Sequence, residues 1–254
     1  MNPTLALVYG IVAYLAFFGT FTYAIGFVGN LLVPKSIDSG EPGPLGFSIL
    51  VNAVLLMVFV VQHTIMARPA FKREWTKIVP QPIERGTFVL AASLALMLIF
   101  WQWRPIPTLV WDIQQPIART ILWTLYLSGY GLVLFSSFLI DHFDLFGLRQ
   151  VYFHFTGREY HHPPFIERSI YRRIRHPLMA GFLIAFWCTP TMSQGHLLFA
   201  VLSTGYIFFG IAVEERDLLQ ILGPDYRAYR ERTPMILPLG KKKGREREAR
   251  ETAR

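Results

Sequence analysis

The chain has 254 residues, of which 52% are hydrophobic and only 17% are charged. A soluble domain of this size needs more polar surface, so the composition favours an integral membrane protein. The single cysteine, Cys188, excludes an intrachain disulfide framework and a metal site built from cysteines. The net charge of +8 could indicate nucleic-acid binding, so the positions of the charges have to decide that question.

Six apolar segments approach or exceed the length of about 20 residues that a helix needs to cross a bilayer. In chain order they are Leu5–Leu32, Gly46–Met66, Gly86–Trp103, Ile117–Ile140, Leu178–Met192 and His196–Val213. A short stretch, TPTMSQG, separates the last two, which are expected to form a helical hairpin. The N-terminus has no basic region of the kind that precedes a cleaved signal. The sequence therefore predicts an all-α polytopic membrane bundle of about six transmembrane helices.

The basic residues are distributed unevenly between the two sides of this bundle. Of the 25 Lys and Arg residues, 22 fall after the second segment, after the fourth segment or after Val213, and only Lys35, Arg104 and Arg119 fall on the other side. Cytoplasmic loops are enriched in Lys and Arg, so both termini are predicted to be cytoplasmic. Orientation and attraction to anionic lipid then explain the net charge without nucleic acid.

Three regions follow from this pattern. Residues 1–140 form a four-span N-terminal region, and residues 141–240 contain the polar clusters and the final hairpin. Residues 241–254 form a charged tail without aromatic side chains, which predicts disorder.

Two polar stretches follow the fourth span on the basic side. DHFDLFGLRQ contains Asp141, His142 and Arg149, and an ordinary helix end, with Arg149 paired to Asp141 or Asp144, explains it as well as a functional role does. FHFTGREYHHPPF is an aromatic loop that contains His161, which is consistent with a lid or a substrate-facing segment. Its histidines are not spaced as a metal site requires, so no metal is expected.

The stretch YRRIRHPLMAG places Arg175 and His176 directly before Pro177. Proline is favoured in the first turn of a helix, so Pro177 is predicted to begin the fifth span. The free amide groups of that first turn, together with Arg175 and His176, are suited to a carboxylate or phosphate. Gly181 would allow a ligand or another backbone to approach one turn later.

The stretch VEERDLLQILGPDYRAYRERTP follows the sixth span. Glu214 and Glu215 lie at the cytoplasmic end of that span, and Tyr226, Tyr229 and Arg230 follow the Gly-Pro turn. The spacing of the apolar residues after the two glutamates predicts that the helix continues past Val213, as an amphipathic segment, to the Gly-Pro turn. An amphipathic surface helix explains the leucines but leaves two adjacent glutamates near the membrane unexplained. Because a hairpin brings its two ends together, the basic residues before Pro177 should lie close to the two glutamates. A site that combines cations with carboxylates fits a zwitterionic ligand.

The ordered combination RHPLMAGFLIAFWCTP and EERDLLQILGPDYRAYRERTPMILP resembles the C-terminal signature of the isoprenylcysteine carboxyl methyltransferase family, over roughly the last third of the chain. The resemblance implies that residues 141–240 are a methyltransferase core that binds S-adenosylmethionine at the cytoplasmic face. Leu178 and Met179 depart from the pattern, which often has an aromatic residue after the proline. By position in the motif, the cofactor-binding residues would be Arg175, His176, Pro177, Gly181, Glu214, Glu215, Tyr226, Tyr229 and Arg230.

The upstream motifs QHTIMARPAFK and DHFDLFGLRQ are similar to those of the bacterial methanethiol S-methyltransferases. This resemblance implies an enzyme of a bacterial inner membrane that methylates a small apolar thiol, methanethiol, to dimethyl sulfide. It implies no nucleic acid and no obligatory protein partner. A thiol is mostly protonated near neutral pH, so a base would help, and the candidates are His142, His161 and Asp141.

Two alternatives stay open. The acceptor could be a prenylcysteine carboxylate, a selenol or a lipid. The Gln-His and Phe-Gly elements are also similar to membrane proteins linked to nitric-oxide reductase maturation and carotene isomerisation. That similarity implies a haem-binding isomerase or maturation factor, with His63 and His142 as axial ligands.

Overall fold

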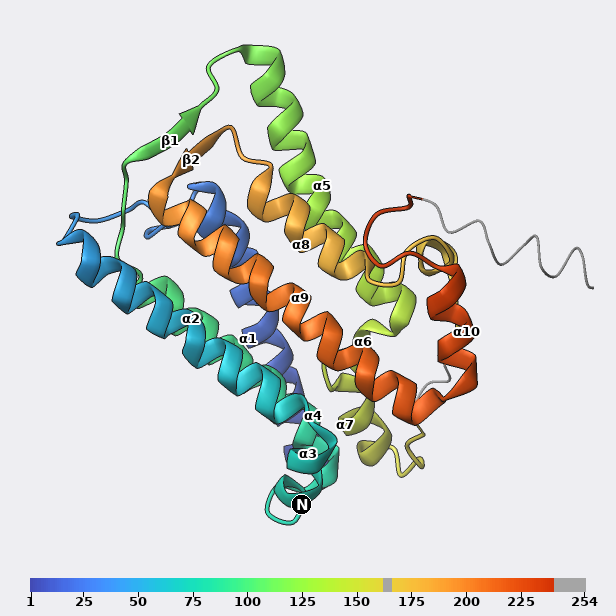
Figure 1. Cartoon of the computed structure of the whole chain (residues 1–254). Coiled ribbons are helices and arrows are strands. Elements are labelled where there is room, and N and C mark those ends of the chain that lie inside the picture. Colours follow the sequence, from blue (N-terminus) through green and yellow to red (C-terminus); the bar gives the residue numbers. More distant parts are fainter. Residues whose placement is uncertain (162–165, 240–254) are drawn as a thin grey trace, which may run out of the picture.

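The computed structural model describes residues 1–161 and 166–239, so His162 and the tail predicted to be disordered lie outside the described residues. Within these described residues, five helices are long and apolar enough to cross a membrane: α1 (Pro3–Gly29), α2 (Leu45–Ala67), α4 (Gln81–Gln102), α5 (Pro116–Ile140) and α9 (Gln194–Leu222). A shorter apolar helix, α8 (Pro177–Trp187), lies beside α5 (Figure 1). The prediction of an all-α membrane bundle with about six apolar helices is confirmed.

Several short elements connect these helices and were not predicted. They are α3 (Pro69–Trp75), α6 (His142–Leu145), α7 (Leu148–Phe155), the 3₁₀ helix η1 (Ser169–Arg172), α10 (Pro224–Arg232) and the strands β1 (Leu109–Asp112) and β2 (Thr191–Ser193). The strands pair antiparallel, with Asp112 opposite Thr191. They lie about 80 residues apart in the sequence and are very short, so no local pattern indicates their pairing.

The fifth predicted span, Leu178–Met192, is shorter than expected. Its helix, α8, has 11 residues, which at 1.5 Å per residue is about 16 Å, or about half of a hydrocarbon core. The chain then continues without helix into β2. The segment is therefore a half-length helix followed by a strand, and not one continuous helix.

Close backbone contact between α5 and α8 explains why two glycines face each other there. A Cβ atom on Gly181 would lie 2.6 Å from the carbonyl oxygen of Gly129, and one on Gly129 would lie 2.7 Å from the carbonyl oxygen of Gly181. Small residues allow membrane helices to pack this closely. The sequence allowed either a ligand or another backbone to approach Gly181. In the structure, the backbone of α5 occupies that space.

The loops predicted to be cytoplasmic gather at one end of the bundle. The end of α2, the start of α4, the end of α5 and the end of α9 lie at the same end in Figure 1. The Tyr9 hydroxyl near the start of α1 donates to Thr87 Oγ1 near the start of α4, at 2.9 Å. Helix α9 continues past Val213 to Leu222, as predicted, so Glu214 and Glu215 lie within a helix and not at its end. That this end faces the cytoplasm stays a prediction.

Candidate functional site

The centre of the candidate site is an ion pair between Arg175, two residues before α8, and Glu215 in the last part of α9. Arg175 Nε donates to Glu215 Oε1 at 2.7 Å, and both side chains are only 7% exposed. Each charge needs the other, because an unpaired charge in such a buried position is very costly. The hairpin therefore brings Arg175 and Glu215 together, as the sequence predicted.

Two further side chains complete the surroundings of Glu215. His176 Nε2 lies 3.0 Å from Glu215 Oε1, and Arg230 Nε of α10 lies 3.1 Å from Glu215 Oε2. Both carboxylate oxygens are therefore occupied by groups from the protein. We call Arg175, His176, Glu215 and Arg230 the ion network, and it joins the start of α8, the end of α9 and α10.

The segment after α10 closes over the ion network. The backbone N–H of Arg175 donates to the carbonyl of Pro234 at 2.9 Å, and that of His176 donates to the carbonyl of Met235 at 3.0 Å. The Arg175 guanidinium also donates to the carbonyls of Arg230 and Thr233. Sequence reasoning missed this role of residues 233–235, because backbone carbonyls carry no residue-type signal.

These bonds change the role expected for Arg175. Pro177 begins α8 as predicted, but the amides of Arg175 and His176 and the Arg175 guanidinium are all bonded within the protein. Arg175 therefore holds α9 and α10 in place in this structure, and the expected direct contact with a ligand carboxylate would have to displace these bonds.

The two tyrosines after the Gly-Pro turn belong to α10, and their side chains are buried. Tyr226 is 1% exposed and Tyr229 is 2% exposed, and the Tyr229 hydroxyl donates to the carbonyl of Tyr171 at 2.6 Å. Burial raises the pKa of both phenols above the ordinary value, so they stay neutral. Their positions anchor α10 against η1, beside the ion network.

Glu214 differs from its neighbour in its surroundings. Its side chain is 50% exposed, and its Oε2 atom lies 3.8 Å from His176 Nδ1. Three residues later, Asp217 forms an ion pair of 2.8 Å with Arg68 at the end of α2. Glu214 is therefore a carboxylate that a ligand can reach, at the junction of α2, α8 and α9.

The candidate base His142 is held by two hydroxyl groups. Its Nε2 lies 2.9 Å from the Tyr14 hydroxyl, and its Nδ1 lies 2.8 Å from Ser137 Oγ. Burial lowers the pKa of His142 below the ordinary value, so its ring is neutral at neutral pH. With both nitrogens bonded, His142 would have to lose one of these contacts to become an axial haem ligand.

The other two candidate bases have different surroundings. Asp141 accepts from the Arg149 guanidinium and from the backbone N–H of Asp144, so it caps α6 as the simple helix-end interpretation predicts. The side chain of His161 is 75% exposed and lies 3.8 Å from the carboxylate of Glu159. Among the described residues, no hydrogen bond or ion pair joins Asp141, His142 or His161 to the ion network.

His63, the other residue considered for haem, lies in an aromatic cluster. Its ring lies 5.2 Å from the Phe59 ring and 4.9 Å from the Phe88 ring, measured between centroids. Its Nδ1 atom is buried without a hydrogen-bond partner among the described residues. Within residues 1–161 and 166–239, no group of three or more His, Cys, Asp or Glu side chains is arranged to hold a metal ion.

Comparison with known proteins gives close and distant relatives. Methanethiol S-methyltransferase of Mycobacterium tuberculosis is 51% identical over 94% of this chain and 98% of that protein. Methanethiol S-methyltransferase 2 of Bradyrhizobium diazoefficiens is 52% identical over 91% of this chain and 89% of that protein. Nurim of Bos taurus is 30% identical over 86% of this chain and 91% of that protein. No solved structure matches the chain.

A family comparison covers the middle and most of the C-terminal part of the chain. The family model described as NnrU protein matches residues 51–224, which include most of α2 and all of α4, α5, α8 and α9. The motifs indicated a resemblance to the methanethiol S-methyltransferases. The two relatives of that name, which are 51% and 52% identical to this chain, confirm it. The chain therefore belongs to the NnrU protein family.

Proposed function

We propose that this protein is an S-adenosylmethionine-dependent membrane methyltransferase that converts methanethiol to dimethyl sulfide. The observation that carries the proposal is the identity of 51% with a methanethiol S-methyltransferase along almost the entire length of both proteins. The candidate site adds a physical reason, because it combines an exposed carboxylate and a cation at the junction of α8, α9 and α10.

The cofactor is proposed to bind at the exposed edge of the ion network. S-adenosylmethionine carries a carboxylate, an ammonium group and ribose hydroxyls. Glu214 would accept from the ammonium or the hydroxyls, and Arg230, whose side chain is 48% exposed, would donate to the carboxylate. Arg175, His176 and Glu215 would position these two groups, and the buried side chains of Tyr226 and Tyr229 would hold α10 in place.

The reaction needs a thiolate placed in line with the sulfonium methyl group. The thiolate sulfur forms the new bond to the methyl carbon, the bond from that carbon to the sulfonium sulfur breaks, and the thiol proton leaves to a base. Holding the two reactants together makes the step effectively unimolecular. Of the three candidate bases we propose His142, because its ring is neutral and the Tyr14 hydroxyl that contacts it could relay a proton.

A bilayer location suits such a substrate. Methanethiol is small and apolar, so it can reach the enzyme through the membrane that the five long helices are suited to cross. We further propose that the enzyme lies in a bacterial inner membrane, with the ion network on the cytoplasmic side. The distribution of Lys and Arg supports this orientation.

The proposed cofactor contact is tested by replacing Glu214. Glu214→Ala is expected to weaken S-adenosylmethionine binding by about 10- to 100-fold, because one charge-assisted hydrogen bond contributes about 1.5–3 kcal/mol. The measurement is calorimetric titration of the purified protein with S-adenosylmethionine. The unfolding temperature without ligand should stay close to that of the parent, since the Glu214 side chain is half exposed.

Glu231→Ala is the matched control. It removes another exposed carboxylate, from α10, and should leave the dissociation constant unchanged. Parent-like affinity in the Glu214 variant, or an equal loss in both variants, would contradict the proposed contact.

A further inference from the structure

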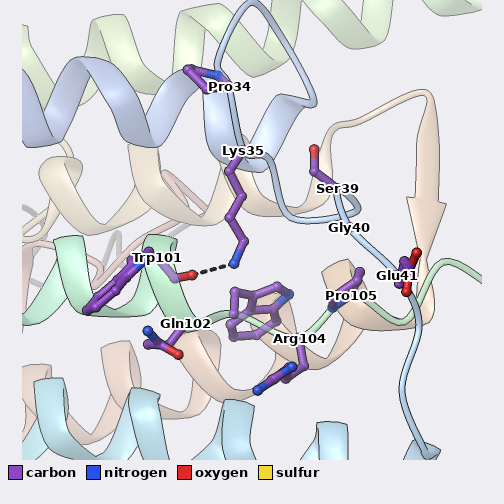
Figure 2. A pocket seen from close by; sticks show the side chains of 10 residues that line it. Pro34, Lys35, Ser39, Gly40, Glu41, Trp101, Gln102, Arg104 and Pro105 are labelled. Carbon is purple, nitrogen blue, oxygen red and sulfur yellow. Dashed lines mark hydrogen bonds between the residues drawn. The ribbon is translucent and has the colours of Figure 1, made fainter.

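A second site lies at the other end of the bundle. A pocket of about 450 Å³ is formed by the loop after α1 and the end of α4, and we call it the far-end pocket. Its lining includes Lys35, Ser39, Glu41, Trp101, Trp103 and Arg104 (Figure 2).

The far-end pocket is remote from the ion network. The segment that follows it contacts the start of α9, where the backbone N–H of Gly195 donates to the carbonyl of Ile106 at 3.0 Å. Glu215 lies 20 residues further along the same helix, which corresponds to about 30 Å at 1.5 Å per residue. A ligand in the far-end pocket would therefore not be the proposed cofactor or its methyl acceptor.

Two cations in the far-end pocket lack a carboxylate partner. Lys35 Nζ donates to the backbone carbonyl of Trp101, as the dashed line in Figure 2 shows. Among the described residues, neither Lys35 nor Arg104 forms an ion pair. Burial and the nearby charge of Arg104 lower the pKa of Lys35 below the ordinary value. An anion bound beside both side chains would offset the repulsion between the positive charges of Lys35 and Arg104.

The charge of the pocket indicates which anion fits. Lys35 and Arg104 carry two positive charges and Glu41 carries one negative charge, so the lining has one net positive charge. A phosphodiester has one negative charge, which balances the net charge of the lining. Inorganic phosphate at neutral pH carries more than one negative charge. Arginine and lysine are the usual partners of phosphate oxygens.

The surroundings of the pocket are those of a membrane interface. Trp101 is 71% exposed at the end of α4, and tryptophan is enriched where a span meets the headgroup layer. Leu94 and Met97 are 57% and 40% exposed, and their spacing places them on the same face of α4 as Trp101. This apolar stripe leads along the helix from the pocket toward the middle of the membrane.

We propose that the far-end pocket binds the phosphodiester headgroup of one anionic membrane phospholipid between Lys35 and Arg104, with an acyl chain along Leu94 and Met97. The bound lipid would tie the loop after α1 to the end of α4. Lys and Arg are enriched in cytoplasmic loops, and the far-end pocket lies at the end opposite the basic loops. The lipid would therefore come from the non-cytoplasmic leaflet.

The test is lipid retention by the full chain, purified in mild detergent and analysed by native mass spectrometry. The parent should retain one phosphatidylglycerol molecule during titration with that lipid. Each basic side chain near an anionic lipid strengthens binding by about fivefold, so the double variant Lys35→Gln/Arg104→Gln should bind about 25-fold more weakly. The double variant Lys35→Arg/Arg104→Lys keeps both charges and should bind like the parent.

Arg119→Gln is the matched control, since it removes a cation at the same end that does not line the pocket and already pairs with Asp112 at 3.4 Å. It should retain the lipid. Parent-like retention by the Gln double variant would overturn the proposal, and so would an equal loss in the Arg119 variant. Displacement of the lipid by inorganic phosphate at an equal concentration would also overturn it, because the site would then prefer a free anion.

Discussion

Glu215→Ala is expected to destabilise the protein by about 3–5 kcal/mol, the usual effect of removing one partner from a buried ion pair. The carboxylate of Glu215 is 7% exposed and accepts from Arg175, His176 and Arg230. Its loss would leave the Arg175 charge buried without a counter-ion and would release α10 from the end of α9. The unfolding temperature in detergent should fall by roughly 10 °C.

Glu74→Ala is the control for this effect. Glu74 also forms a short ion pair, 2.6 Å from Lys77, but its side chain is 67% exposed. Exposed pairs contribute about 0–1 kcal/mol, so this variant should unfold close to the parent temperature. Equal stability of the two variants would show that Glu215 is not the counter-ion that holds the three elements together.

Gly181→Ala is expected to be the second most damaging change. The added Cβ would lie 2.6 Å from the carbonyl oxygen of Gly129 and 2.9 Å from a side-chain atom of Val133. Neither helix backbone can move away without opening the contact between α5 and α8, and overpacking of this kind costs about 1–3 kcal/mol. The measurement is the unfolding temperature without cofactor.

Gly131→Ala provides a matched comparison on α5. A Cβ at Gly131 meets nothing within 4 Å, so the substitution should be neutral or slightly stabilising, because alanine favours the helix. The resemblance assigns Gly181 to the cofactor site, whereas the structure assigns it to helix packing. A Gly181 variant that keeps its stability but loses S-adenosylmethionine binding would contradict the packing role.

The long helices could be predicted from the sequence because their apolar length alone identifies them. The start of α8 at Pro177 and the continuation of α9 past Val213 were also readable, the first from proline preference and the second from the spacing of leucines. The end of α8 was placed too late, because residues 188–192 were counted in the span although Pro190 and the two threonines beside it disfavour a helix. They leave the helix to form a strand with a segment about 80 residues earlier.

The candidate site was predicted in its composition but not in its division of roles. The hairpin brings Arg175, His176 and Glu215 together as expected. Two adjacent glutamates look equivalent in the sequence, but one points into the ion network and the other is half exposed. That difference depends on the rotation of α9 against α8 and α10, which local sequence does not encode.

The candidate bases illustrate the same limit. A histidine at the end of a span could be a base, a haem ligand or a buried structural residue. One hydroxyl partner of His142, Ser137, is local, but the other comes from a helix far away in the sequence. Tyr14 lies 128 residues before it. No motif around His142 indicates that contact.

The most direct test of the proposed function is the measurement of dimethyl sulfide by headspace gas chromatography. Purified protein with S-adenosylmethionine and methanethiol should release dimethyl sulfide and S-adenosylhomocysteine in equal amounts, and the Glu214→Ala protein should release less at limiting cofactor. A prenylcysteine, a selenol and a lipid serve as competing acceptors in the same assay. Cofactor turnover with one of these acceptors and none with methanethiol, or no turnover with any of them, would contradict the proposed reaction.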